Sequence, residues 1–249
     1  MTWALRFMGV GNAQAAPVLG SASAVLENDG EAVLLIDCGQ EALTAYQAHY
    51  QRLPTAVFIT HLHMDHVGGL ERLFYSAYFD AGLRGKVRLY VPAAIVPAMQ
   101  SRLADYPGVL AEGGANWWDA FQLIPVSSGF WHDGLYFEVF PVRHHLPDSA
   151  FGLRLPGSFF WSGDTRPIPE RLKTVVGSGE LIAHDCALVG NPSHTGLADI
   201  QREYPADWHA DLMLYHYANR ADADALRAAG FRVAEPMQAV ALASPTMHN

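Results

Sequence analysis

A run of metal-ligand side chains directly follows a short apolar segment and constrains the fold more than any other feature of the sequence. The segment, residues 56–59, is predicted to be a strand, and His61, His63, Asp65 and His66 come next. Side chains alternate along extended backbone, so positions 61, 63 and 65 can point to one side. Three imidazoles and one carboxylate within six residues are donors that suit zinc and similar divalent ions. The alternative is a solvated polar turn, but crowded imidazoles would repel one another once protonated.

Apolar runs with turn residues between them alternate with segments of helical periodicity along the whole chain. Strands are predicted at residues 4–8, 22–27, 32–36, 56–59, 87–91, 122–126, 135–142, 151–155, 158–161, 181–183 and 212–215. Helices are predicted at residues 42–52, 69–79, 94–104, 197–203 and 221–229. This alternation indicates a layered α/β fold. No linker rich in Pro, Gly or Ser divides the sequence, so we expect a single domain over residues 1–249.

Composition excludes several classes of protein. The formal net charge is −9 and no basic stripe is visible, which argues against a nucleic-acid partner. Two cysteines, Cys38 and Cys186, are too few for a disulfide-built secreted scaffold. No run reaches 18 apolar residues, and Arg6, Gly9 and Gly11 interrupt the first apolar run before it could serve as a signal-peptide core. We therefore expect a soluble, cytoplasmic protein that has no membrane partner.

The pattern His-x-His-x-Asp-His at residues 61–66 resembles the signature of the metallo-β-lactamase superfamily at every defined position. The resemblance extends over most of the chain. It implies a four-layer αββα sandwich with two mixed β-sheets, and it implies further ligands at the ends of later strands. The sequence has candidates there: Asp37 follows residues 32–36, His144 follows residues 135–142, Asp164 follows residues 158–161, and His216 follows residues 212–215.

The resemblance also implies how these side chains divide between two divalent ions, zinc in the first place and manganese or iron as alternatives. One ion would be held by His61, His63 and His144, the other by Asp65, His66 and His216, with Asp164 shared between them. Asp37 would brace the metal loop from behind the ligands. His145 competes with its neighbour His144 for the ligand position.

Two features of the sequence bear on the reaction. Superfamily members that carry out di-iron redox chemistry usually have Glu at the position of His63, so this histidine favours a hydrolase. Asp185 and His194 resemble the ribonuclease Z-like phosphodiesterase branch, where such a histidine precedes the last ligand by 22 residues, as His194 precedes His216. In that branch the histidine acts as general acid, so His194 is a catalytic candidate and Asp185 a bracing residue. Asp65 is the other catalytic candidate. The branch more often has Glu at the position of Asp185, and the segment around His194 could instead cap a helix.

A small phosphodiester, such as a cyclic nucleotide or a phospholipid-derived headgroup, fits the acidic chain better than transfer RNA, because no basic, glycine-rich arm is present. The alternatives are a thioester, lactone or β-lactam hydrolase with the same metal centre, and a non-catalytic metal-binding sensor. Dimers are frequent in the resembling branch, so a homodimer is a candidate assembly, although the sequence does not determine the oligomeric state.

Two sets of residues are candidates for the substrate site. Aromatic side chains crowd residues 117–131 and could wall a pocket, or could belong to the core or to a subunit contact. They are Trp117, Trp118, Phe121, Phe130 and Trp131. Arg143, Arg154 and Arg166 are candidate phosphate partners, with a solvated surface role as the alternative.

Overall fold

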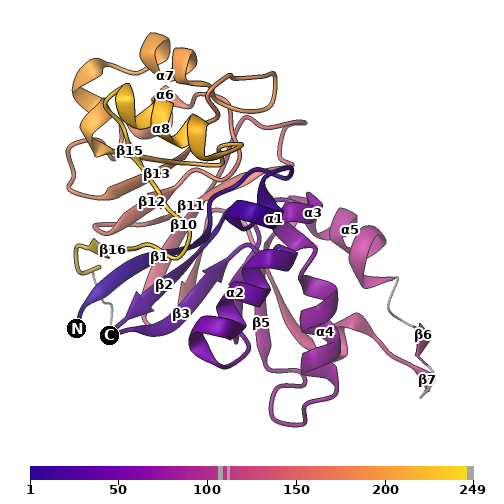
Figure 1. The fold of residues 1–249 in the computed structure, drawn as a ribbon. Coiled ribbons are helices and arrows are strands. Elements are labelled where there is room, and N and C mark those ends of the chain that lie inside the picture. The colour runs from indigo at the N-terminus through magenta and orange to yellow at the C-terminus, as the bar shows by residue number, and fades with distance from the viewer. Residues whose placement is uncertain (106–108, 111–112, 246–249) are drawn as a thin grey trace.

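Two seven-stranded β-sheets lie face to face, with helices on their outer sides (Figure 1). The structure, a computed structural model, describes residues 1–105, 109–110 and 113–245. In Figure 1, α2, α4 and α5 lie beside the N-terminal sheet, and α6, α7 and α8 lie beside the C-terminal sheet. The predicted α/β sandwich with two mixed sheets is confirmed.

The two sheets share one pattern of strand pairing. The first sheet has the order β16 (Ala239–Leu242), β1 (Trp3–Gly9), β2 (Ser23–Asn28), β3 (Glu31–Ile36), β4 (Ala56–Phe58), β5 (Val87–Pro92) and β8 (Phe121–Val126). The second has the order β15 (Arg232–Val233), β14 (Leu212–Tyr215), β13 (Leu181–Asp185), β12 (Phe159–Trp161), β11 (Phe151–Leu155), β10 (Leu135–Pro141) and β9 (Gly129–His132). In each sheet one half pairs antiparallel and the other half parallel, and β6 (Val109–Leu110) pairs separately with β7 (Gly113–Gly114).

Helices connect the parallel strands, as crossover connections require. The α-helices are α1 (Ala16–Leu19), α2 (Gln40–Tyr50), α3 (Met64–Val67), α4 (Leu70–Tyr78), α5 (Val96–Met99), α6 (Pro169–Leu172), α7 (Leu197–Glu203) and α8 (Arg220–Ala228). The prediction of a single helix over residues 94–104 is wrong. This segment divides into a 3₁₀ turn (Ala93–Ile95), α5 and a π-helical turn (Gln100–Ala104), and Pro97, which has no N–H to donate, lies in the first turn of α5. Further 3₁₀ turns are Trp117–Asp119 and Ala206–Asp211.

Aromatic side chains fill the space between the sheets. Phe7 of β1 packs on Trp161 of β12, with ring centroids 5.8 Å apart, and Trp161 stacks on Tyr215 of β14 at 4.2 Å. Phe130 of β9 stacks on Tyr90 of β5, with centroids 4.2 Å apart. Because the contacts of Phe7 with Trp161 and of Phe130 with Tyr90 join strands from both sheets, burial of these rings fixes how one sheet lies on the other.

The parallel strands bring their carboxyl ends to a common edge of each sheet. Strands β3 and β4 run parallel, and so do β12, β13 and β14. Strands β4, β12 and β14 are buried along their whole length, which explains their continuous apolar runs. The polar side chains that follow these strands therefore meet at one place. Within the described ranges, no helix is long and apolar enough to cross a membrane, and Cys38 and Cys186 are separate buried thiols.

Gly39, between β3 and α2, provides a test of how tightly this edge is packed. A Cβ atom at Gly39 would overlap the backbone oxygen of Asp65 and the side chain of Ser21. We expect Gly39→Ala to lower the free energy of unfolding by about 2 kcal/mol, because this overlap forces the segment of residues 61–66 to move. Chemical denaturation of both proteins measures the change. Gly114→Ala is the control, since nothing lies within 4 Å of its added methyl group, and equal stability of the two variants would contradict the prediction.

Candidate metal centre

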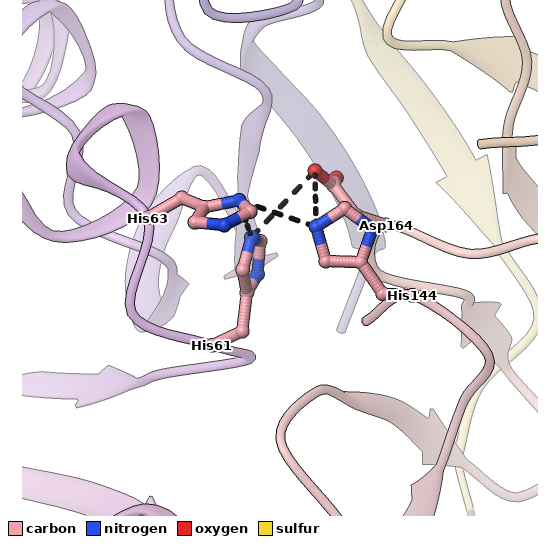
Figure 2. A group of neighbouring side chains, drawn as sticks. All are labelled: His61, His63, His144 and Asp164. Carbon is pink, nitrogen blue, oxygen red and sulfur yellow. Dashed lines mark hydrogen bonds and ion pairs between the residues drawn. The ribbon is translucent and has the colours of Figure 1, made fainter. Parts of the chain in front are cut away.

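The seven side chains predicted as ligands converge at the shared edge of the two sheets. His61 and His63 lie between β4 and α3, and Asp65 and His66 belong to α3. His144, Asp164 and His216 follow β10, β12 and β14. Figure 2 shows four of them, His61, His63, His144 and Asp164, pointing toward one another from segments far apart in the sequence.

The first cluster consists of these four side chains. His63 Nδ1 lies 3.0 Å from His61 Nε2 and 3.2 Å from His144 Nε2. Asp164 Oδ2 lies 3.7 Å from His61 Nε2 and 3.9 Å from His144 Nε2. Three ring nitrogens and one carboxylate oxygen thus surround a single point, which is the donor set that a divalent metal of the zinc type takes.

The second cluster shares Asp164 with the first. His66 Nε2 lies 3.3 Å from Asp164 Oδ2 and 3.5 Å from Asp65 Oδ2. His216 Nε2 lies 3.2 Å from Asp164 Oδ2 and 4.0 Å from Asp65 Oδ2. One carboxylate between two sets of ligand atoms is an arrangement that can hold a pair of ions side by side.

Buried polar atoms without hydrogen-bond partners test whether the site fits a metal. In the described part of the chain, His66 Nε2, His216 Nε2 and Asp164 Oδ1 are buried and accept or donate no hydrogen bond. Leaving such atoms unpaired in the interior costs about 1–3 kcal/mol each. All three belong to residues at the junction of the two clusters, so bound cations would satisfy them, and the residues present fit the predicted metal pair.

Asp37 stands behind the ligands, as the resemblance implies. Its carboxylate accepts hydrogen bonds from the backbone N–H and the hydroxyl of Thr60 at 2.8 and 2.7 Å, and pairs with His66 Nδ1 at 2.8 Å. The Thr60 hydroxyl also lies 3.0 Å from His61 Nδ1. Asp37 therefore orients a histidine of each cluster, one directly and one through Thr60, a residue that the sequence analysis missed. The backbone of Asp37 is left-handed (φ 61°), a strained conformation that is often found at functional sites.

Asp185 orients histidines of the site in the same way as Asp37 does. Its two carboxylate oxygens lie 3.2 Å from His216 Nδ1 and 2.9 Å from His194 Nδ1, and one of them accepts the backbone N–H of Thr165 at 2.8 Å. His194 thus lies beside the second cluster. The alternative that Ser or Thr of this segment caps a helix is wrong, because Gly196 is the N-cap residue of α7 and the Asp199 carboxylate accepts its backbone N–H.

The geometry separates His144 from His145. His144 turns Nε2 toward His63 and engages the Ser193 carbonyl oxygen with Nδ1 at 2.9 Å. His145 lies outside both ligand clusters; its ring packs on the edge of His63 at 4.6 Å, and its Nδ1 lies 3.4 Å from Ser193 Oγ. The structure therefore favours His144 as the ligand.

Burial and charge divide the histidines into two kinds. Burial lowers the pKa of His61 far below its usual range and lowers the pKa of His144 to about 4. Burial also acts against a charge on His66 and His216, but nearby carboxylates outweigh it. Asp164 and Asp37 raise the pKa of His66 well above its usual value, and Asp164 and Asp185 raise that of His216 to about 9. Without metal, His66 and His216 therefore carry protons at neutral pH.

This difference predicts that metal binding releases protons. His66 and His216 must lose theirs to bind a cation, so we expect zinc to displace about two protons at pH 7.5. The apparent zinc affinity should rise with pH up to about 9, where His216 is half deprotonated in the metal-free protein. Calorimetric titration in buffers of different ionisation enthalpy measures the release. Asp185→Asn should release less, and a heat independent of buffer would contradict the prediction.

A cavity of about 870 Å³ opens onto the second cluster. Its described lining includes His63, Asp65, Asp164, His194 and His216. None of the five aromatic residues predicted as possible pocket walls is among its described lining. Trp117, Phe121 and Phe130 are buried, Trp118 donates to Gln100, and Trp131 is 54% exposed on β9. The aromatic segment therefore contributes mainly to the core.

The arginines predicted as phosphate partners lie elsewhere. Arg154 pairs with Glu180 at 2.7 Å and with Glu138 at 3.0 Å. Arg143 and Arg166 line a separate groove of about 390 Å³, and Arg143 pairs there with Glu170. The structure therefore gives no support for a phosphate contact by these arginines in the metal cavity.

Comparison with known proteins places the chain in a family. The model of the anti-Pycsar protein Apyc1 family matches residues 3–240. The chain belongs to the Apyc1 family. An anti-Pycsar protein Apyc1 from Saccharibacillus brassicae is 33% identical over 226 residues, which cover 86% of this chain and 90% of that protein.

This Apyc1 family member has two further likenesses, one to part of a curated relative and one to a solved structure of the same fold. The mouse zinc phosphodiesterase ELAC protein 1 is 35% identical over 101 residues, 38% of this chain and 27% of that protein. The metallo-β-lactamase fold protein YhfI from Bacillus subtilis matches with a TM-score of 0.73 at 13% identity, covering 96% of this chain and 99% of that one. The predicted metallo-β-lactamase fold and the predicted hydrolytic enzyme class are confirmed.

Proposed function

We propose that this protein is a phosphodiesterase with two metal ions that hydrolyses a small phosphodiester, most simply a cyclic mononucleotide. The observation that carries the proposal is Asp164, whose one carboxylate joins both ligand clusters. Buried nitrogens of His66 and His216 lie 3.3 and 3.2 Å from it and make no hydrogen bond. His61, His63 and His144 would hold one ion, and Asp65, His66 and His216 the other. Zinc suits these donors best, and manganese or iron are alternatives.

Two bound divalent ions would supply a hydroxide at neutral pH and positive charge for the phosphate oxygens. Side chains of the protein would carry out the proton transfers. Asp65 lines the cavity, and contact with His66 outweighs burial to keep its pKa low, so it is ionised and can accept a proton from the attacking water. His194 uses Nδ1 to contact Asp185, which leaves Nε2 as the nitrogen that can give a proton to the departing oxygen.

The size and charge of the cavity support a small substrate. A volume of about 870 Å³ is in the usual range for a pocket that encloses a ligand of nucleotide size. The net charge of −9 disfavours a long nucleic-acid backbone. The mouse relative named a zinc phosphodiesterase agrees with this reaction class. The candidate homodimer and the expected cytoplasmic location remain predictions.

Metal analysis combined with a substrate panel tests the proposal. We expect about two ions per chain and turnover of bis(p-nitrophenyl) phosphate and of cyclic mononucleotides. The panel also contains a thioester, a lactone and a β-lactam. Turnover of any of these without turnover of phosphodiesters would favour the other hydrolase class. Tight nucleotide binding to fully loaded protein without turnover would favour a sensor.

A further inference from the structure

Two carboxylates that belong to no predicted ligand set line the cavity. Glu41 belongs to the first turn of α2, and Glu71 to the first turn of α4. Loop residues such as Asn12 and Gln14 add neutral polar groups to this lining. Among the described residues that line the cavity there is no lysine and no arginine. Apart from the metal centre, this lining is therefore negative, and no cation there offsets its charge.

The two carboxylates are placed in different ways. Glu41 accepts a hydrogen bond from the hydroxyl of Ser21 at 2.7 Å, and Ser21 is completely buried, so this carboxylate is held in position. The Glu71 side chain makes no hydrogen bond or ion pair with any described residue. Its neighbour Arg72 is turned away, toward Thr44 and Gln47 of α2. Nothing in the described structure neutralises Glu71, and its charge acts on whatever enters the cavity.

The lining thus offers positive charge only at the metal centre once metal is bound. One phosphate group is attracted to the metal centre, whereas a second phosphate on the same molecule would find carboxylates and no cation elsewhere in the described lining. We propose that Glu41 and Glu71 are specificity-determining residues that restrict the cavity to ligands with one phosphate group. This inference rests on the proposed function, because it assumes that a phosphoester enters this cavity.

The expected size of the effect follows from electrostatics. A carboxylate within several ångströms of a second phosphate in a partly solvated cavity weakens binding by roughly tenfold, and salt reduces the effect. A neutral base or sugar is not penalised, since its N–H or O–H groups can donate to the same carboxylates. An unselective metal pair would behave in the opposite way and bind the more highly charged ligand more tightly.

Calorimetric binding to the zinc-loaded protein tests the proposal with adenosine 5′-monophosphate and adenosine 3′,5′-bisphosphate. We expect the wild-type protein to bind the bisphosphate at least about tenfold more weakly. Glu71→Gln should narrow this ratio several-fold, and Glu41→Gln combined with Glu71→Gln should remove it. Glu31→Gln, at an exposed site outside the cavity lining, is the matched control and should leave the ratio as it is. Thermal unfolding checks that each variant is folded.

Three results would overturn the proposal: equal or tighter binding of the bisphosphate by the wild type, an unchanged ratio in folded Glu71→Gln protein, or no binding of either nucleotide. Hydrolysis is measured separately with thymidine 5′-(p-nitrophenyl phosphate) and its 3′-phosphorylated form. Failure to hydrolyse both, with the binding ratio as expected, would count against the phosphodiesterase and leave the charge selection supported. A tenfold preference for the unphosphorylated form, lost in the double variant, would support both.

Discussion

Replacing Asp164 by asparagine is expected to remove the metal pair and to lower kcat/KM for phosphodiesters by about a thousandfold. Asp164 Oδ2 lies between 3.2 and 4.0 Å from ring nitrogens of five histidines; four of them belong to the two ligand clusters and the fifth is His194. The asparagine side chain has the same shape but no negative charge, so it cannot offset two neighbouring cations. Metal content by mass spectrometry and the rate of bis(p-nitrophenyl) phosphate cleavage measure the loss.

The control for this substitution is Asp207→Asn. Asp207 is exposed in the 3₁₀ turn Ala206–Asp211, and it belongs neither to the ligand clusters nor to the described cavity lining. The Asp207→Asn protein should keep both metal ions and full activity. If Asp164→Asn protein also kept two ions and near wild-type activity, the shared carboxylate would not be part of the metal centre, and the proposed catalyst would be wrong.

The ligand positions could be predicted from the sequence because each one follows a strand that its own residues specify. The apolar runs before His61, Asp164 and His216 correspond to strands β4, β12 and β14, and parallel pairing brings their carboxyl ends together. The left-handed backbone at Asp37 and His216 could not be predicted. Aspartate and histidine adopt that conformation more often than most residues do, also in ordinary turns such as the one at Asp29, so residue type alone does not identify these two positions.

The fold was least predictable where pairing is most distant in the sequence. Strand β16 pairs with β1, so Trp3 lies opposite Leu242, and nothing local in residues 239–242 indicates this partner. Strand β9 was also missed, although its pairing partner, β10, is near in the sequence. Long-range partners are set by burial against the other sheet, which a sequence window does not contain.

The walls of the cavity could not be predicted for the same reason. Glu41, Glu71 and the loop containing Asn12 come from three separate parts of the chain and meet only after both sheets have formed. The aromatic residues 117–131 carried a stronger local signal, but burial places most of them in the core instead. A ligand set at strand ends thus has a sequence pattern, whereas a substrate pocket built from loops and helix starts has none.

Replacing His194 by alanine is expected to affect substrates according to their leaving group. A cyclic nucleotide expels a sugar alkoxide that needs a proton, so its kcat/KM should fall about 10²–10⁴-fold without a general acid. Bis(p-nitrophenyl) phosphate expels a stable phenolate and should lose less than about tenfold. His194 belongs to neither predicted ligand set and is held by Asp185, so both metal ions should remain. Parallel assays of the two substrates with metal analysis measure these effects.

The pattern of losses in His194→Ala distinguishes three roles. Selective loss on the cyclic nucleotide with metal retained identifies the general acid. Equal loss on both substrates together with loss of an ion would make His194 a ligand, which its distance of 4.0 Å from Asp164 does not itself forbid. Full activity on both would reduce it to a structural residue of the loop before α7. His49→Ala, at an exposed histidine of α2 remote from the cavity, is the control and should leave both activities and the metal content unchanged.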